Sequence, residues 1–77
     1  MQARLLGIQH INFTNNTGEQ INGNNIFCAF KDENVKGLRT EKFFIKPEVK
    51  LPACKLNDTI EISFNMKGKV EMLRKAE

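Results

Sequence analysis

Two lysines flank a phenylalanine at alternate positions near the middle of the chain: Lys42, Phe44 and Lys46. Alternate side chains of an extended strand project from the same face, so this spacing places an aromatic ring between two ammonium groups. Single-stranded nucleic acid is bound by this combination, because bases stack on aromatic faces while cations follow the phosphates. The pattern predicts a polyanion-binding surface rather than a catalytic centre.

The orientation of Phe44 stays open in the sequence. If Phe44 belongs to the core, either Phe43 and Ile45 face outward or a tight barrel buries both phenylalanines. If Phe44 is exposed, its ring is free to stack on a base. The chain has six Phe and no Trp or Tyr, which weakens a stacking platform. Both arrangements remain compatible with the alternation.

A second group of cations surrounds a glycine near the end of the chain, where Lys67 and Lys69 flank Gly68. A protruding cationic hairpin can straddle a nucleic-acid backbone. The alternative is that lysines at tips and edges suppress edge-to-edge aggregation. Arg39 has the opposite parity to Lys42 and joins them only if the strand twists. The candidate nucleic-acid-binding residues are therefore Arg39, Lys42, Phe44, Lys46, Lys67 and Lys69.

Residues for catalysis or metal binding are few. His10 is the only histidine, and Cys28 and Cys54 stand 26 positions apart without a CxxC spacing. Zinc sites need closely spaced ligands, so we expect two buried free thiols instead. Asp32 and Glu33 fall in a turn, where charge is expected anyway. No enzyme activity, metal or cofactor is expected.

The charges lie mostly in the second part of the chain. The net charge is +3, yet residues 1–30 hold only Arg4 and Glu19, while residues 31–77 hold eleven bases and eight acids. This distribution permits a polyanionic partner without requiring one. No apolar run approaches the ~20 residues of a membrane span, and residues 1–9 do not resemble a secretory signal. We expect a single domain, 1–77, in the cytoplasm and without a membrane partner.

Alternating apolar residues predict five strands. Residues 5–14, with a bulge or bend at Gly7, form the first, and residues 19–25 read as a loop or a frayed strand end. Residues 26–31 and 38–46 follow, and residues 59–73 form a closing hairpin. Turns are predicted at 15–18, 32–37 and 57–58. Residues 46–56 carry both prolines and are predicted as a loop, and residues 74–77 as a polar tail. The hairpin's predicted core positions are Ile60, Ile62, Phe64, Val70 and Met72.

Five short strands in so small a chain favour a sheet that curls onto itself, because curling removes exposed edges. We therefore expect an all-β fold: a small five-stranded antiparallel barrel, OB-like, with an SH3-like barrel as the alternative.

The segment from Leu56 to Val70, L-x-x-T-I-E-I-S-F-N-x-x-G-K-V, resembles the last two strands of small single-stranded-DNA-binding proteins of phages and mobile elements. The filamentous-phage gene V type is the best-known example. The resemblance implies an OB-like barrel, usually dimeric, that coats single strands. That family uses tyrosines and arginines for contact, whereas this chain has no Tyr and three Arg. Lys42, Phe44 and Lys46 would take that role here.

Two functional hypotheses follow. The first is a non-enzymatic protein of a phage, plasmid or integrative element that binds single-stranded DNA or other single-stranded nucleic acid. The second is a small protein-interaction or structural module without nucleic-acid binding, such as a homodimer that pairs edge strands.

Overall fold

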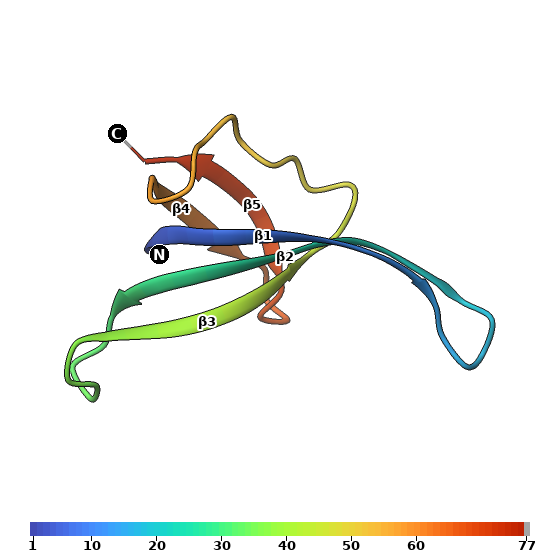
Figure 1. The fold of residues 1–77 in the computed structure, drawn as a ribbon, viewed down its shortest axis with the longest axis horizontal. Coiled ribbons are helices and arrows are strands. Elements are labelled where there is room, and N and C mark those ends of the chain that lie inside the picture. The colour runs from blue at the N-terminus through green and yellow to red at the C-terminus, as the bar shows by residue number, and fades with distance from the viewer. Residues whose placement is uncertain (77) are drawn as a thin grey trace.

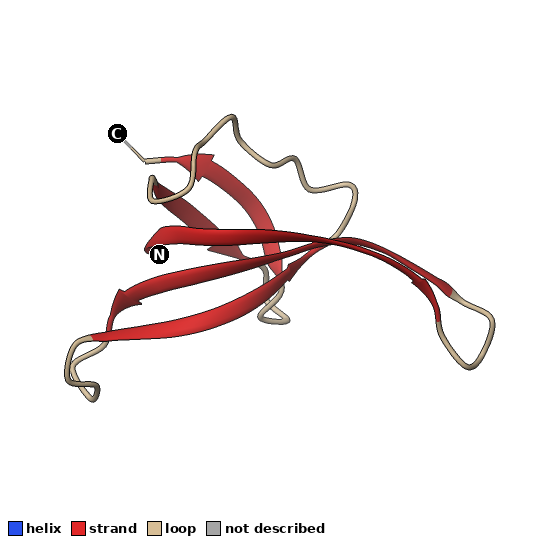
Figure 2. Cartoon of the chain, in the orientation of Figure 1, coloured by secondary structure: helices blue, strands red, loops and turns tan. Residues whose placement is uncertain are grey.

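The computed structural model describes residues 1–76, which form one antiparallel sheet of five strands and contain no helix (Figure 1, Figure 2). Along the sheet the strands follow the order β3-β2-β1-β4-β5. The all-β prediction is confirmed. The strands are β1 (Gln2–Thr14), β2 (Gln20–Lys31), β3 (Leu38–Ile45), β4 (Thr59–Phe64) and β5 (Val70–Lys75).

The first two strands form a hairpin longer than expected, because residues 20–25 belong to β2 and are not a loop. Phe13 pairs with Ile21, and Thr14 pairs with Gln20. These pairings extend the β1–β2 ladder through an Asn-rich segment, although the intrinsic strand propensity of Asn is low. The irregularity predicted at Gly7 is confirmed: the register shifts between Leu5 and Gly7.

The core lies on the concave side of the curled sheet. Its fully buried large side chains are aliphatic, apart from one thiol, and every strand contributes at least one buried residue. The long connection between β3 and β4 is a loop, as predicted, and its Val49, Leu51 and Cys54 pack against the core. The turn predicted at 57–58 is also present, since Asn57 adopts φ 76° and its N–H donates to the Leu5 carbonyl at 2.6 Å.

The closing hairpin corrects two predicted core positions. Ile60, Ile62 and Val70 are buried as predicted, but Phe64 and Met72 are 36% and 51% exposed. A register shift displaces Met72: Ser63 pairs with Met72, whereas Phe64 pairs with Val70, so Glu71 is an extra residue of β5. Phe64 keeps the parity of Ile60 and Ile62 and is exposed as the last residue of β4. An extra residue reverses the alternation of the strand beyond it. Leu73 therefore takes the buried place expected for Met72.

The sheet curls without closing. β3 and β5 stand at its two ends and approach each other, but among residues 1–76 no hydrogen-bonded ladder joins them. The predicted polar tail is wrong in part, because Arg74 and Lys75 belong to β5; Glu77 lies outside the described residues. Within residues 1–76, no helix of membrane-spanning length and apolarity occurs.

Candidate nucleic-acid interface

Strand β3 turns Phe44 outward. Its neighbours face the core, since Ile45 is fully buried and Phe43 packs against the core cluster. Phe44, on the opposite parity, is 42% exposed, and Lys42 and Lys46 are exposed beside it. The structure thus adopts the arrangement in which the ring is accessible between two ammonium groups.

A glycine in the neighbouring strand lets the Phe44 ring lie close to the sheet. A Cβ atom on Gly23 would stand 2.7 Å from Cζ of Phe44 and 2.5 Å from the carbonyl oxygen of Ile45. Both distances are too short for any side chain larger than hydrogen. Because Gly23, at φ 157°, has no side chain, the backbone of β3 and the ring of Phe44 can both lie close to it.

Two hollows lie between β3 and the turn that joins β4 to β5. The first, of about 250 Å³, is lined by Lys42, Phe44, Lys46 and Lys69, among others. The second, of about 740 Å³, shares Lys46 and Lys69 with the first, so the two hollows are contiguous. We name this surface the β3 groove and define it by Lys42, Phe44, Lys46, Phe64, Met66, Lys67 and Lys69.

The turn at residues 65–69 positions two of these lysines. The Oδ1 atom of Asn65 accepts hydrogen bonds from the backbone N–H groups of Lys67, at 2.9 Å, and Lys69, at 3.0 Å. Gly68 supplies the left-handed conformation, φ 78°, that the turn requires. Because the backbone of the turn is held by these bonds, the two ammonium groups extend from a defined platform rather than from a loose loop.

Within residues 1–76, the groove lysines have no acidic partner. The ion pairs found there join Arg39 to Asp32 and Glu41, Lys75 to Asp58, and the N-terminal amine to Glu61. Lys42, Lys46, Lys67 and Lys69 take part in none of these pairs. Glu71 is the one acid that lines the groove's hollows. The groove is therefore a locally positive surface on a chain of nearly balanced charge.

Arg39 does not join this surface. Its guanidinium donates to Asp32 at 2.9 Å and to Glu41 at 2.7 Å, and it lies over the ring of Phe30. These two carboxylates raise the pKa of Arg39 further and neutralise its charge locally. Of the six predicted site residues, the structure brings five together and leaves Arg39 apart.

Sequence reasoning missed two apolar residues of the groove and one exposed aromatic residue beside it. Phe64 and Met66 line the larger hollow, and Phe27, 37% exposed, pairs with Lys42 across the ladder. The signal for Phe27 was its parity, opposite to that of the buried Ile26 and Cys28, but its place beside Lys42 depends on the register of β2 and β3. Phe64 also contacts Phe43, with ring centroids 5.5 Å apart, so the groove's floor is aromatic.

Groups that could do covalent chemistry lie elsewhere. Burial raises the pKa of Cys28 to about 11, and the thiolate rather than the thiol is the nucleophile. Cys54 is half-buried against the core, and both thiols are free. Residues 1–76 contain no cluster of three His, Cys, Asp or Glu side chains that would hold a metal ion.

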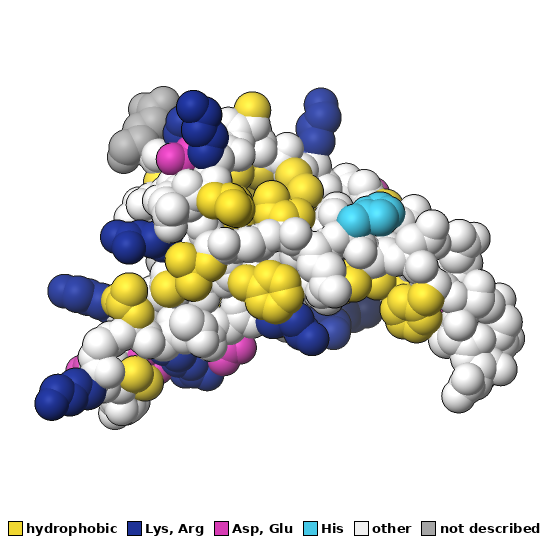
Figure 3. All heavy atoms as spheres, in the orientation of Figure 1, with side chains coloured by type: hydrophobic (Ala, Val, Ile, Leu, Met, Phe, Trp, Pro, Cys, Tyr) yellow, Lys and Arg dark blue, Asp and Glu magenta, His cyan; other side chains and the backbone are white. Residues whose placement is uncertain are grey.

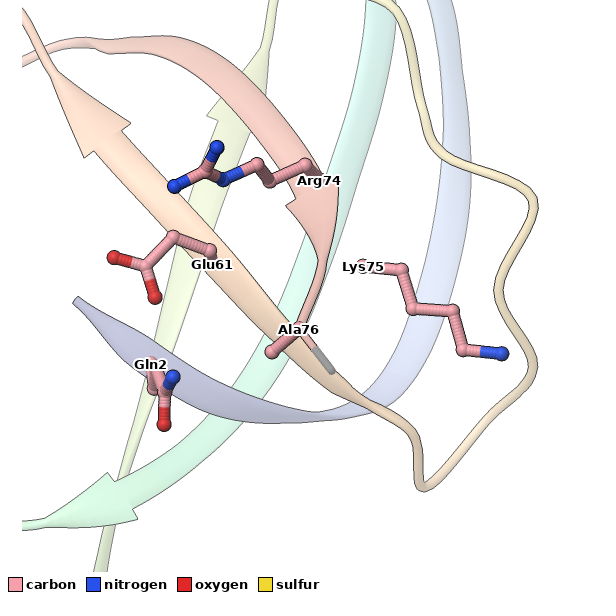
Figure 4. A pocket seen from close by; sticks show the side chains of 5 residues that line it. All are labelled: Gln2, Glu61, Arg74, Lys75 and Ala76. Carbon is pink, nitrogen blue, oxygen red and sulfur yellow. The ribbon is translucent and has the colours of Figure 1, made fainter.

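A third hollow, of about 400 Å³, lies at the opposite end of β5 and is lined by Gln2, Glu61, Arg74, Lys75 and Ala76 (Figure 4). Arg74 and Glu61 point to one side of the strand pair, while Lys75 extends away to the other. Glu61 accepts from the N-terminal amine at 3.2 Å. Because a carboxylate and a guanidinium share this hollow, it offers much less to a polyanion than the β3 groove.

Comparison of the chain with protein-family models, with curated proteins and with solved structures finds no match.

Proposed function

We propose that this chain is a non-enzymatic protein that binds single-stranded nucleic acid in the β3 groove. The observation that carries the proposal is the set of four lysines, without acidic partners among residues 1–76, around the exposed rings of Phe44 and Phe64. Lysines alone would attract any polyanion. Exposed rings between them add faces on which unpaired bases can stack.

The roles divide by chemistry. Phe44 and Phe64 stack on bases, and Lys42, Lys46, Lys67 and Lys69 neutralise phosphates. Ammonium groups are compact point charges without a fixed fork geometry, so their contacts with phosphate carry little sequence information. The affinity of the proposed binding therefore depends strongly on the salt concentration and weakly on the base sequence.

The topology supports this proposal by analogy. A strand order of β3-β2-β1-β4-β5, with β3 near β5, is compatible with a partly open OB barrel. In that fold the face of strands 2 and 3 and the loop between strands 4 and 5 bind oligonucleotides. The β3 groove combines residues from the same two regions, β3 and the β4–β5 turn. Fold analogy is the weaker support, and the groove's own chemistry is the stronger.

Fluorescence anisotropy with labelled oligo-dT at ~50 mM salt tests the proposal, because low salt favours phosphate contacts. Phe44→Ala should weaken binding about 5- to 150-fold, since one stacked base contributes roughly 1–3 kcal/mol. Leu38→Ala is the matched control: Leu38 is 49% exposed on the same strand but far from the groove. No saturable binding at tens of micromolar protein, or equal losses in both variants, would contradict the proposal.

A protein-interaction module is the second candidate, favoured by one observation: large apolar side chains outside the groove are exposed, with Phe13 at 53% and Leu56 at 55%. This hypothesis predicts no oligo-dT binding at all. The same titration therefore separates the two functions.

A further inference from the structure

Met66 is the most exposed large apolar side chain among residues 1–76. Its exposed fraction is 104%, whereas that of the next, Leu56, is 55%. A single exposed apolar residue needs no explanation on most surfaces. Met66 differs by its place, because it lines the larger hollow of the β3 groove together with Phe64 and with lysines that have no acidic partner within residues 1–76.

The β4–β5 turn does not need an apolar residue at this position, as a second turn of the chain shows. In residues 15–19 the side chain of Asn15 accepts from the N–H groups two and four residues on, at 3.1 and 2.9 Å. Asn65 does the same in the β4–β5 turn, at 2.9 and 3.0 Å. In both turns the glycine N–H also donates to the carbonyl of the asparagine, at 3.1 and 3.0 Å. Asn16 occupies the position of Met66, so a polar residue suits the same backbone.

The two turns differ in the charge that surrounds them. The β4–β5 turn carries Lys67 and Lys69, while the matching positions of the β1–β2 turn hold Thr17 and Glu19. In Figure 3 the end of the molecule that carries the β1–β2 turn presents no Lys or Arg. The apolar tip therefore occurs in the turn whose cations would bring a phosphate backbone, and with it the bases, within reach.

A thioether on a fixed turn is suited to enter a stack of bases. Met is unbranched, and its polarizable sulfur makes favourable contacts with aromatic rings. In protein–DNA complexes apolar side chains, Met among them, insert between neighbouring bases and unstack them. In a single strand such an insertion breaks no base pair, so its cost is the stacking of one step. Removal of the Met66 side chain from water offsets that cost.

We propose that Met66 inserts between two neighbouring bases of the strand bound in the β3 groove. Lys67 and Lys69, which follow it in the turn, neutralise phosphates beside the opened step, and the strand is unstacked where it passes the β4–β5 turn. This inference rests on the proposed nucleic-acid binding, to which it adds a contact residue and a distortion of the bound strand.

Two readouts on the full chain test the insertion. Anisotropy of labelled oligo-dT at ~50 mM salt gives the affinity. An oligonucleotide with 2-aminopurine between adenines reports on stacking, because stacked neighbours quench its fluorescence, and the wild type should raise that fluorescence. Met66→Asn, which introduces the residue of the β1–β2 turn, should weaken oligo-dT binding at least about 10-fold, since the burial of one large apolar side chain is lost. It should also abolish the rise in fluorescence.

Asn16→Met is the matched control, because it places the same side chain on the same turn backbone outside the groove. Both readouts should stay within about twofold of the wild type. Met66→Leu keeps an apolar side chain of similar volume and should retain affinity within about threefold. Circular dichroism melts of the three variants should match the wild type, since Met66 lies outside the core cluster and Asn is favoured in turns.

Equal affinities of the wild type and Met66→Asn for oligo-dT would overturn the insertion and leave the proposed function standing. Weaker binding by Met66→Asn with an unchanged rise in fluorescence would also overturn it, because Met66 would then contact the strand without separating its bases. Equal losses in Met66→Asn and Asn16→Met would have the same consequence. No binding of oligo-dT by the wild type would overturn the proposed function and this inference together.

Discussion

The chain contains two turns of the same construction with opposite charge, which permits an unusually clean exchange. In the turn between β1 and β2, Asn15 accepts through Oδ1 from the N–H groups of Thr17 and Glu19, and Gly18 has φ 84°. In the groove, Asn65 does the same for Lys67 and Lys69. The double substitution Lys67→Thr with Lys69→Glu therefore places the third and fifth residues of the first turn, Thr and Glu, at the matching positions of the second.

The expected effect follows from counterion release. Four groove lysines on a single strand give a slope of log K against log salt of about −2.8, so affinity falls roughly 50-fold between ~50 and ~200 mM salt. With Lys67 and Lys69 replaced, two lysines remain, and the slope should shrink to about −1.4, a fall of roughly sevenfold. Affinity at the lowest salt should also drop, because the carboxylate introduced by Lys69→Glu would repel phosphate.

The assay is anisotropy of labelled oligo-dT at several salt concentrations. Lys36→Glu with Lys50→Thr is the matched control, since it changes the net charge by the same amount at exposed positions outside the groove. Its slope should stay near that of the wild type. Equal slopes for the graft and the control would refute the reasoning, because they would mean that net charge rather than the groove drives binding.

Three further outcomes concern stability. Gly23→Ala should destabilise the fold by about 1–3 kcal/mol in chemical denaturation, because the new Cβ meets backbone at 2.5 Å. Leu73→Ala should cost about 2–5 kcal/mol, whereas Met72→Ala should stay within about 0.5 kcal/mol; the reverse order would contradict the register shift in β5. The backbone N–H of Lys55 and then the ammonium of Lys75 lower the pKa of Asp58, so its stabilising contribution is present above the unfolded value of about 3.9 and is lost as pH falls through the folded value. Melting temperatures of Asp58→Asn between neutral and acid pH should fall less steeply than those of the wild type.

Local sequence signals predicted the strands and turns of this chain well. Asn15, Asn57 and Gly68 each stand in turns that need their particular chemistry, whether a side-chain acceptor or a left-handed conformation. The alternation of Ile60 and Ile62 identified a buried face. These features depend on a few neighbouring residues, so a single sequence contains them.

Register and bulges could not be predicted in the same way. One extra residue, Glu71, places Met72 at the surface. The alternation of apolar and polar residues in β5 does not indicate this register shift. The first part of β2, predicted as a loop or a frayed strand end, forms a ladder through cross-strand pairs in spite of its low strand propensity. The groove itself joins Phe44 to Phe64, two residues from separate strands, and depends on how far the sheet curls.

The open seam between β3 and β5 explains why two interpretations of the lysines are both physically reasonable. Near the place where a ladder would close a barrel, Phe43 of β3 contacts Phe64 at the end of β4 through side chains alone, and Lys42 and Lys46 stand along the unpaired end of the sheet. Lysines there protect an edge from pairing with another chain, and so would any other charged residue. Phosphate binding, by contrast, requires the positive sign. Lys42→Glu with Lys46→Glu should therefore keep the chain soluble and folded under either interpretation, but abolish oligo-dT binding only if the groove is the site; retained binding would leave edge protection as the sole role of these lysines.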